Sequence, residues 1–153
     1  MPVAITLGTV NSANVISQSW NNVYRVIQDN VSDPSSRSVS WVFSAFPQQR
    51  KGTASVYPCI IIESPSLRGQ NITMGHSKRV YTWDIPISIY ATRMATTEEI
   101  ANDVIAAMET NKGSIEANGM WQFNVDNVNT FHNLQNSQVI HEKRIMISCE
   151  GYI

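Results

Sequence analysis

The sequence carries little charge and contains no long apolar run. It has 11 basic and 12 acidic side chains among 153 residues, a formal net charge of −1, and a charged fraction of 15%, below the roughly 25% of a typical soluble domain. So small and balanced a charge argues against nucleic-acid binding through bulk electrostatics. No apolar stretch approaches the roughly 20 residues that a membrane-spanning helix needs. The N-terminal residues lack a basic segment followed by a sustained apolar core, so we predict no signal peptide and a cytoplasmic origin.

Cysteine and the usual catalytic motifs are also scarce. Cys59 and Cys149 each lie in an apolar, strand-like run, which favours two buried thiols over a disulfide. The three histidines show no metal-ligand spacing with these thiols. There is no G-x-S-x-G nucleophile elbow and no Gly-rich phosphate loop. We therefore predict no catalytic residue, no metal and no cofactor.

Two segments show helical periodicity. Over residues 12–30, apolar side chains recur every three or four positions, and Ser12 or Asn14 is placed to cap the helix. The second helix is expected over 97–112. There, Thr96 and Glu99 have the spacing of a capping box, and Lys112-Gly113 is a stop signal.

The remaining patterned segments predict strands. Alternation or short apolar runs mark residues 39–45, 57–63, 81–91, 121–126 and 139–148. The 81–91 strand has one apolar and one polar face, so the polar face is either solvent-facing or available to a partner. Pro86 in its middle suggests an edge or a bulge. Polar segments separate the strands, notably a loop over about 64–77 and a stretch over 127–137.

This order of elements predicts an α+β fold. We expect a single domain over residues 1–153, with a mostly antiparallel sheet, two helices packed on one face, the order α-β-β-β-α-β-β, and an extended loop at about 64–77. Trp20, Trp41, Trp83 and Trp121 are interpreted as packing residues.

Isolated polar residues offer weak functional signals. His76 is interpreted as an exposed loop histidine, and His141-Glu142 beside Lys143-Arg144 as solvated strand charge. His132 carries no signal of its own. The carboxylates of Glu63, Asp84 and Glu142 fall on different strands, and the sequence leaves open whether they converge.

One known group shares this organisation. The stretch Tyr57-Pro58-Cys59-Ile60-Ile61-Ile62-Glu63, the alternating strand Ile85–Ala91 and the helix containing Ile100 follow in the same order. Over about residues 12–150 the chain resembles the tail-terminator (tail-completion) and related head-to-tail joining proteins of long-tailed bacteriophages. The resemblance implies a structural virion protein without an active site. It would act at the tail/neck junction, as a six-fold ring that caps the tail tube and gives the head connector a docking surface.

The same resemblance implies the partners. These are further copies of the chain, the tail tube protein and the connector or neck proteins; genome DNA would pass through the lumen without specific binding, and no membrane is involved. Because loops on rigid scaffolds carry function, the ring or tube contacts are expected in and beside the 64–77 loop, from Leu67, Arg68, Ile72, Met74, His76 and Arg79.

Two other functions stay open. One is a head-side neck or stopper protein of the same junction. The other is a small α+β ligand-binding module or enzyme that uses the concave face of its sheet. A joining protein should assemble, whereas a binding module should be a monomer or dimer with a pocket.

Overall fold

The computed structural model describes residues 6–47, 56–71, 79–135 and 138–152. The helices are α1 (Val15–Asn30) and α2 (Met94–Ala117). The strands are β1 (Val42–Phe43), β2 (Cys59–Ile62), β3 (Ser66–Asn71), β4 (Arg79–Ala91), β5 (Trp121–Gln135) and β6 (Gln138–Tyr152). No helix in these ranges is long and apolar enough to cross a membrane.

All six strands belong to one sheet built around β4. The order is β1-β2-β4-β6-β5, and β3 also pairs with β4. One edge of β4 is shared, because β2 pairs with Ile87–Tyr90 and β3 with Arg79–Asp84. Its other edge pairs with β6. Among the described strands only β1 and β2 run parallel, so the predicted mostly antiparallel α+β fold is confirmed.

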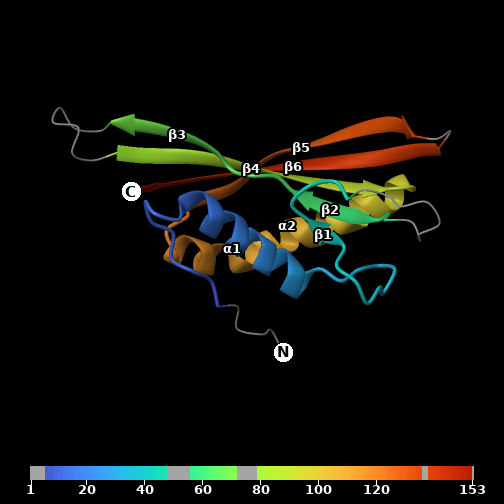
Figure 1. Cartoon of the computed structure of the whole chain (residues 1–153), viewed down its shortest axis with the longest axis horizontal. Helices are drawn as coiled ribbons and strands as arrows, with labels where there is room; N and C mark the ends of the chain where they lie inside the picture. Colours follow the sequence, from blue (N-terminus) through green and yellow to red (C-terminus); the bar gives the residue numbers. More distant parts are fainter. Residues whose placement is uncertain (1–5, 48–55, 72–78, 136–137, 153) are drawn as a thin grey trace.

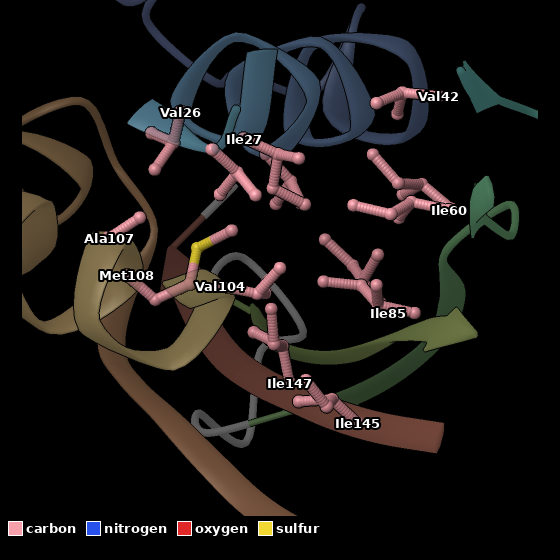
Figure 2. Close-up of a cluster of buried hydrophobic side chains, with 14 of the residues drawn as sticks. Val26, Ile27, Val42, Ile60, Ile85, Val104, Ala107, Met108, Ile145 and Ile147 are labelled. Carbon is pink, nitrogen blue, oxygen red and sulfur yellow. The ribbon is translucent and has the colours of Figure 1, made fainter. Parts of the chain in front are cut away.

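Both helices lie on one face of the sheet, as the sequence predicted, and no helix of the described residues lies on the opposite face (Figure 1). The alternation in β4 sends Ile85, Ile87 and Ile89 toward the helices, and none of the three is exposed. They belong to the same buried cluster as Val26 and Ile27 of α1, and Figure 2 shows Ile85 in that cluster. Apolar residues of α2, β2 and β6 complete this layer, among them Val104, Met108, Ile60, Ile145 and Ile147.

Both predicted caps of α2 are wrong. The helix begins at Met94, and the Thr97 hydroxyl donates to the Met94 carbonyl at 2.6 Å. At the other end it continues past Gly113 because the next turn buries Ile115 completely. The left-handed glycine is Gly119, whose φ is 95°. The Gly119 N–H donates to the Glu116 carbonyl at 3.1 Å and the Met120 N–H to the Ile115 carbonyl at 3.4 Å, the paired bonds of a Schellman motif.

The start of α1 is partly as expected. Asn14 is its N-cap residue, but the side chain makes no capping hydrogen bond. Instead the Asn14 carboxamide oxygen accepts from the Asn11 N–H at 2.8 Å, and its NH₂ group donates to the Thr9 carbonyl at 3.2 Å. Asn14 therefore fixes the preceding loop against the helix.

Three polar or aromatic segments depart from prediction. Residues 66–71 are not loop but strand β3, because they pair in register with β4. Residues 127–135 continue strand β5, which has register shifts between Trp121 and Asn124 and between Val125 and Asn127. The strand expected over 39–45 is reduced to Val42–Phe43, since only these residues lie opposite β2.

Pro86 is neither at an edge nor in a bulge. It lies in the middle of β4, paired with Met146 of β6, at the point where β2 gives way to β3 on the other side. Its carbonyl accepts from the Glu63 N–H at 2.9 Å. A residue of an antiparallel ladder points its N–H and C=O to the same neighbour. The donor that proline lacks therefore faces Glu63, just beyond the end of β2, and the ladder between β4 and β6 keeps its hydrogen bonds.

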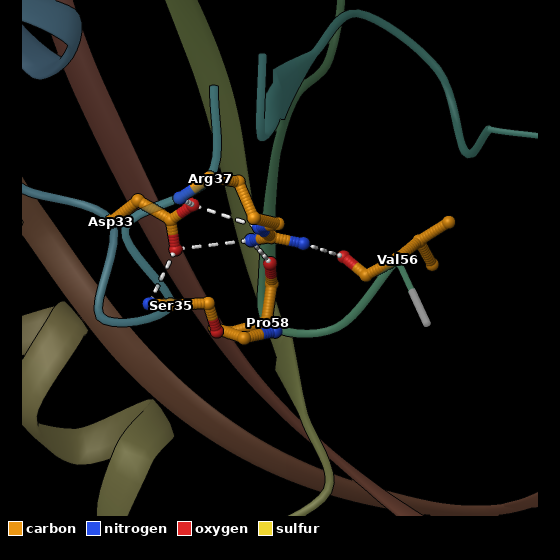
Figure 3. A network of polar contacts seen from close by, with 5 residues as sticks. All are labelled: Asp33, Ser35, Arg37, Val56 and Pro58. Atoms are coloured by element: carbon orange, nitrogen blue, oxygen red, sulfur yellow. Dashed lines mark hydrogen bonds and ion pairs between the residues drawn. The ribbon is translucent and has the colours of Figure 1, made fainter. Parts of the chain in front are cut away.

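A polar network ties the segment after α1 to the start of β2 (Figure 3). Arg37 donates to both carboxylate oxygens of Asp33, at 2.7 and 3.1 Å, and to the Val56 carbonyl at 2.9 Å; it also donates to the Pro58 carbonyl. Burial tends to raise the pKa of Asp33, but hydrogen bonds from Arg37 and from the Ser35 N–H outweigh it and lower the pKa. The network fixes where the chain enters the sheet.

Candidate interaction surface

The sheet face opposite the helices is hollowed over β3, β4 and β6. The hollow is polar, with a volume of about 690 Å³. Its lining residues are Arg68, Gly69, Thr82, Asp84, Asp126 and Ser148. Arg68 stands over it, with its side chain 82% exposed and a guanidinium nitrogen 3.6 Å from the Asp84 carboxylate. This is the polar face of the 81–91 strand that the sequence left to solvent or a partner.

The predicted contact residues lie in different environments. Arg68 lies on the open face, whereas Leu67 of the same strand is opposite Trp83 and packs against the core. Arg79 is the first residue of β4, paired with Asn71. Ile72, Met74 and His76 lie outside the described residues. The structure thus places Arg68 in the middle of the β3–β4 ladder and Arg79 at one end of it, and the contacts themselves stay a prediction.

Farther along the same face, two of the three strand carboxylates converge. The Arg144 guanidinium lies 3.1 Å from the Glu142 carboxylate and 4.0 Å from that of Glu63. The Phe131 ring stacks near it, 5.5 Å from the guanidinium carbon to the ring centroid. Glu142 is only 5% exposed, so its interpretation as solvated strand charge is wrong. Asp84 belongs instead to the Arg68 pair.

Aromatic side chains cover the β2–β4 end of this face. Phe46 meets Tyr90 edge-on, with 5.3 Å between ring centroids, and tilts against Tyr57 at 6.0 Å. Burial raises the pKa of the Tyr90 phenol, and the nearby Glu142 charge raises it further. The open face therefore has a polar half over β3 and a partly buried, aromatic half over β2.

Four exposed apolar side chains gather on the β5–β6 hairpin. Strand β4 ends at Ala91, opposite His141, and the two strands of the hairpin continue beyond it (Figure 1). The exposed fractions are 39% for Val128, 42% for Phe131, 73% for Leu134 and 45% for Val139. The other edge of β5 pairs with no strand in the described ranges. We call residues 128–135 of β5 together with Val139 the hairpin arm.

Sequence reasoning missed the hairpin arm because residues 127–137 were taken as a polar connection. The short connection between the two strands is nevertheless a signal of a hairpin. Only two residues, 136–137, separate β5 from β6, a spacing typical of a hairpin. The same oversight hid a pair of histidines, because His132 lies directly opposite His141 in this register.

The tryptophans and cysteines mostly follow expectation. Trp41 and Trp83 are buried, and the Trp20 indole N–H donates to the Ile62 carbonyl at 2.7 Å. Trp121 is 50% exposed, so its interpretation as a packing residue is wrong. Both cysteines are free and buried, as predicted. In the part of the chain that the structure describes, no group of three or more His, Cys, Asp and Glu side chains could hold a metal ion.

The comparison with solved structures gives several similar chains, one of which is described here. No protein-family model matches the sequence, and the search of curated proteins gives no match. A solved chain from the "Virion of native gene transfer agent (GTA) particle" is similar over 88% of this chain and 94% of that chain, with 9% sequence identity and a TM-score of 0.45.

Proposed function

We propose that the protein is a structural component of a phage-type virion. In this proposal it assembles as a ring at the tail/neck junction, caps the tail tube and joins it to the head connector, without catalysis. The resemblance of the sequence to tail-completion proteins leads to this role. The observation that carries it is the free edge of β5, with the apolar side chains of the hairpin arm beside it.

An exposed strand edge is a template for pairing with another chain, and proteins that stay monomeric protect such edges with lysine, proline, inward charges or short strands. Strand β5 is 15 residues long and contains no lysine, arginine or proline; its single carboxylate is Asp126. Phe131 and Leu134 add exposed apolar area. The two register shifts lie before Asn127, so the free edge from Asn127 to Gln135 is regular and weakly protected, which fits a partner in the assembled state.

The sheet has a second free edge on its other side. Strand β3 pairs with β4 alone among the described strands. A subunit whose sheet ends in β5 on one side and β3 on the other can join copies head to tail, and such a heterologous interface closes into a ring when the rotation allows. The low charge of the chain suits this arrangement, because the cores of interfaces are depleted in charged residues.

The remaining surfaces are then assigned to the other partners. The open face over β3 and β4, with Arg68 and Asp84, would meet the tail tube or the connector, and Ile72, Met74, His76 and Arg79 would extend that contact. Genome DNA would pass through the lumen without specific binding, in keeping with a net charge of −1. A head-side neck or stopper protein would use the same ring, so the choice of tube or connector is an outcome of the test.

The first experiment measures the mass of the purified protein by light scattering over a range of concentrations. A hexamer of 17.1-kDa chains has a mass of about 103 kDa. A closed ring of this or a similar mass supports the proposal. Because a ring can require its tube, a monomer is next mixed with tail tubes made from the tube protein encoded in the same gene block. A monomer that binds neither these tubes nor the neighbouring connector overturns the proposal.

A matched pair of substitutions tests the β5 edge. Leu134→Asp places a charge in the hairpin arm and is expected to abolish ring formation or tube capture. Ile16→Asp is the control, because Ile16 is an exposed apolar residue on α1, outside the hairpin arm, at 47% exposure. Loss of assembly in the control alone, or normal assembly of Leu134→Asp, means that the subunits meet elsewhere.

A further inference from the structure

Two histidine side chains meet on the β5–β6 hairpin. His132 and His141 are directly opposite each other in the register, and their Nδ1 atoms lie 2.8 Å apart. The ring centroids are 4.8 Å apart, with the rings at 87° to one another. The contact is exposed to solvent. Nothing in the proposed ring role accounts for this pair.

The neighbouring cross-strand pairs on the same face of the hairpin leave the two histidines available for a ligand. On one side, the Lys143 ammonium donates to the Thr130 hydroxyl at 2.9 Å and lies 3.8 Å from the Glu98 carboxylate of α2. Its charge is thus engaged by two partners. On the other side lie Leu134 and Val139, both exposed and neither able to bind the rings by hydrogen bonds. The polar contact that the structure describes for each imidazole is therefore the one with the other imidazole.

We propose that His132 and His141 form a binding site for a divalent transition metal ion, with both Nδ1 atoms as ligands and water in the remaining positions. Imidazole nitrogen is a preferred ligand of Cu²⁺, Ni²⁺ and Zn²⁺. In the neutral, metal-free pair one ring holds its proton on Nδ1 and donates to the other. Metal binding requires that this proton move through water to Nε2 of the same ring, so each ring stays neutral and no proton is released.

The expected choice of metal follows from the ligand type. The 2.8 Å between the two Nδ1 atoms is the length of their hydrogen bond in the metal-free pair, so the rings must turn to direct both nitrogens at one ion. Imidazole ligands bind Cu²⁺ more tightly than Ni²⁺ or Zn²⁺ on the general affinity series, so we expect the highest affinity for Cu²⁺.

The position of the site gives it a structural consequence. His141 faces Ala91, the last residue of β4, so beyond this row β5 and β6 pair only with each other. A metal ion that links the two strands here would clip the base of the free part of the hairpin. Binding should slow hydrogen exchange of the backbone amides in 133–135 and 138–140 and leave the amides of α1 unchanged.

The test uses the untagged full-length chain, stripped with a chelator and titrated with Cu²⁺ or Ni²⁺ by calorimetry. We expect one ion per chain. His132→Gln and His141→Gln should each weaken binding by about 100-fold, because the second ligand acts at high effective concentration. Asn129→Gln, at an exposed position of the same strand as His132, is the matched control and should bind as the unaltered protein does. Equal binding by either hairpin variant, or loss of binding in the control, overturns the proposal.

A second measurement needs no variant. Electron paramagnetic resonance of the Cu²⁺-loaded protein should show two coordinated imidazole nitrogens, and the bound metal should protect His132 and His141 from diethylpyrocarbonate. Protection of His76 instead, or of neither hairpin histidine, rejects the site.

Discussion

Trp83 lies directly against Gly151 across strands β4 and β6. A β-carbon built on Gly151 would be 2.8 Å from Cη2 of the indole and 3.0 Å from the Gly119 carbonyl oxygen. Trp83 is fully buried, so its ring has no room to withdraw. The glycine is therefore needed for close approach, and the backbone of β6 passes beneath the indole because no side chain intervenes.

Gly151→Ala should destabilise the fold by about 1 to 3 kcal/mol, the usual cost of overpacking a core. The control is Gly113→Ala in α2, where a β-carbon would meet nothing within 4 Å; alanine there should stabilise by about 0.5 to 1 kcal/mol. Urea denaturation measures both free energies of unfolding. A neutral Gly151→Ala variant would mean that Trp83 does not pack over this strand.

The planar, forked guanidinium of Arg37 should contribute more to the free energy of unfolding than its positive charge does. The side chain makes a two-point contact with Asp33 and also donates to two carbonyls of 56–58. Arg37→Ala leaves these acceptors without their donor and should cost about 2 to 4 kcal/mol. Arg37→Lys keeps the charge but cannot reproduce the planar fork, so it should recover less than half of the loss. Full recovery by lysine would show that charge alone matters.

Acid should remove the contribution of the Asp33 carboxylate to the free energy of unfolding. Its pKa is below the ordinary value in the folded protein, so the carboxylate stabilises the fold at every pH above the unfolded pKa of about 3.9. This contribution is lost as the pH falls through the lower, folded pKa. The difference in unfolding free energy between the unaltered protein and Asp33→Asn should be constant from pH 7 to 5 and shrink below about pH 4. A difference that shrinks between pH 7 and 5 would contradict this assignment.

The helices and strands in which apolar residues recur at a regular spacing were predictable from the sequence. The residues at which they end were not. The alternation through Ile85, Ile87 and Ile89 follows from the pleat of a strand and needs no knowledge of the partner strands. The end of α2 depends on distant residues. Glycine inside a helix costs about 1 kcal/mol, whereas burying Ile115 contributes roughly 2 kcal/mol. Burial outweighs the local stop signal at Gly113, and the helix ends before Gly119.

The candidate surface was only partly predictable because it depends on long-range pairing. Strand β3 has a polar sequence and forms because Leu67 and its neighbours pair with β4. The sequence identified Arg68 as a surface residue but could not show its pairing with Asp84. The far half of β5 looks like a loop because asparagine, threonine and glutamine residues separate its few apolar ones, and strand propensity depends on context. The hairpin arm and the histidine pair were hidden for the same reason.

Two arginine–carboxylate pairs on the open face should contribute very different amounts to the free energy of unfolding. Glu142 is 5% exposed and is held by Arg144 at 3.1 Å, whereas Arg68 is 82% exposed and reaches Asp84 at 3.6 Å. Arg144→Met leaves a buried carboxylate without its cation and should cost about 1 to 3 kcal/mol. Arg68→Met should cost at most about 0.5 kcal/mol, as for other exposed pairs. Thermal and urea unfolding compare the two variants, and equal effects would mean that Glu142 is hydrated.

Neither thiol of the native protein should react at pH 8. Only a thiolate attacks an aromatic disulfide reagent. Burial raises the pKa of Cys59 to about 12, with Arg37 lowering it in part. Burial, followed by the charge of Asp84, raises the pKa of Cys149 as well. Titration with such a reagent should therefore detect no thiol in the native state and two in urea. Ser114→Cys, at an exposed position of α2, is the control and should add one fast-reacting thiol. A fast native thiol without this substitution would show that β2 or β6 opens far more readily than its burial implies.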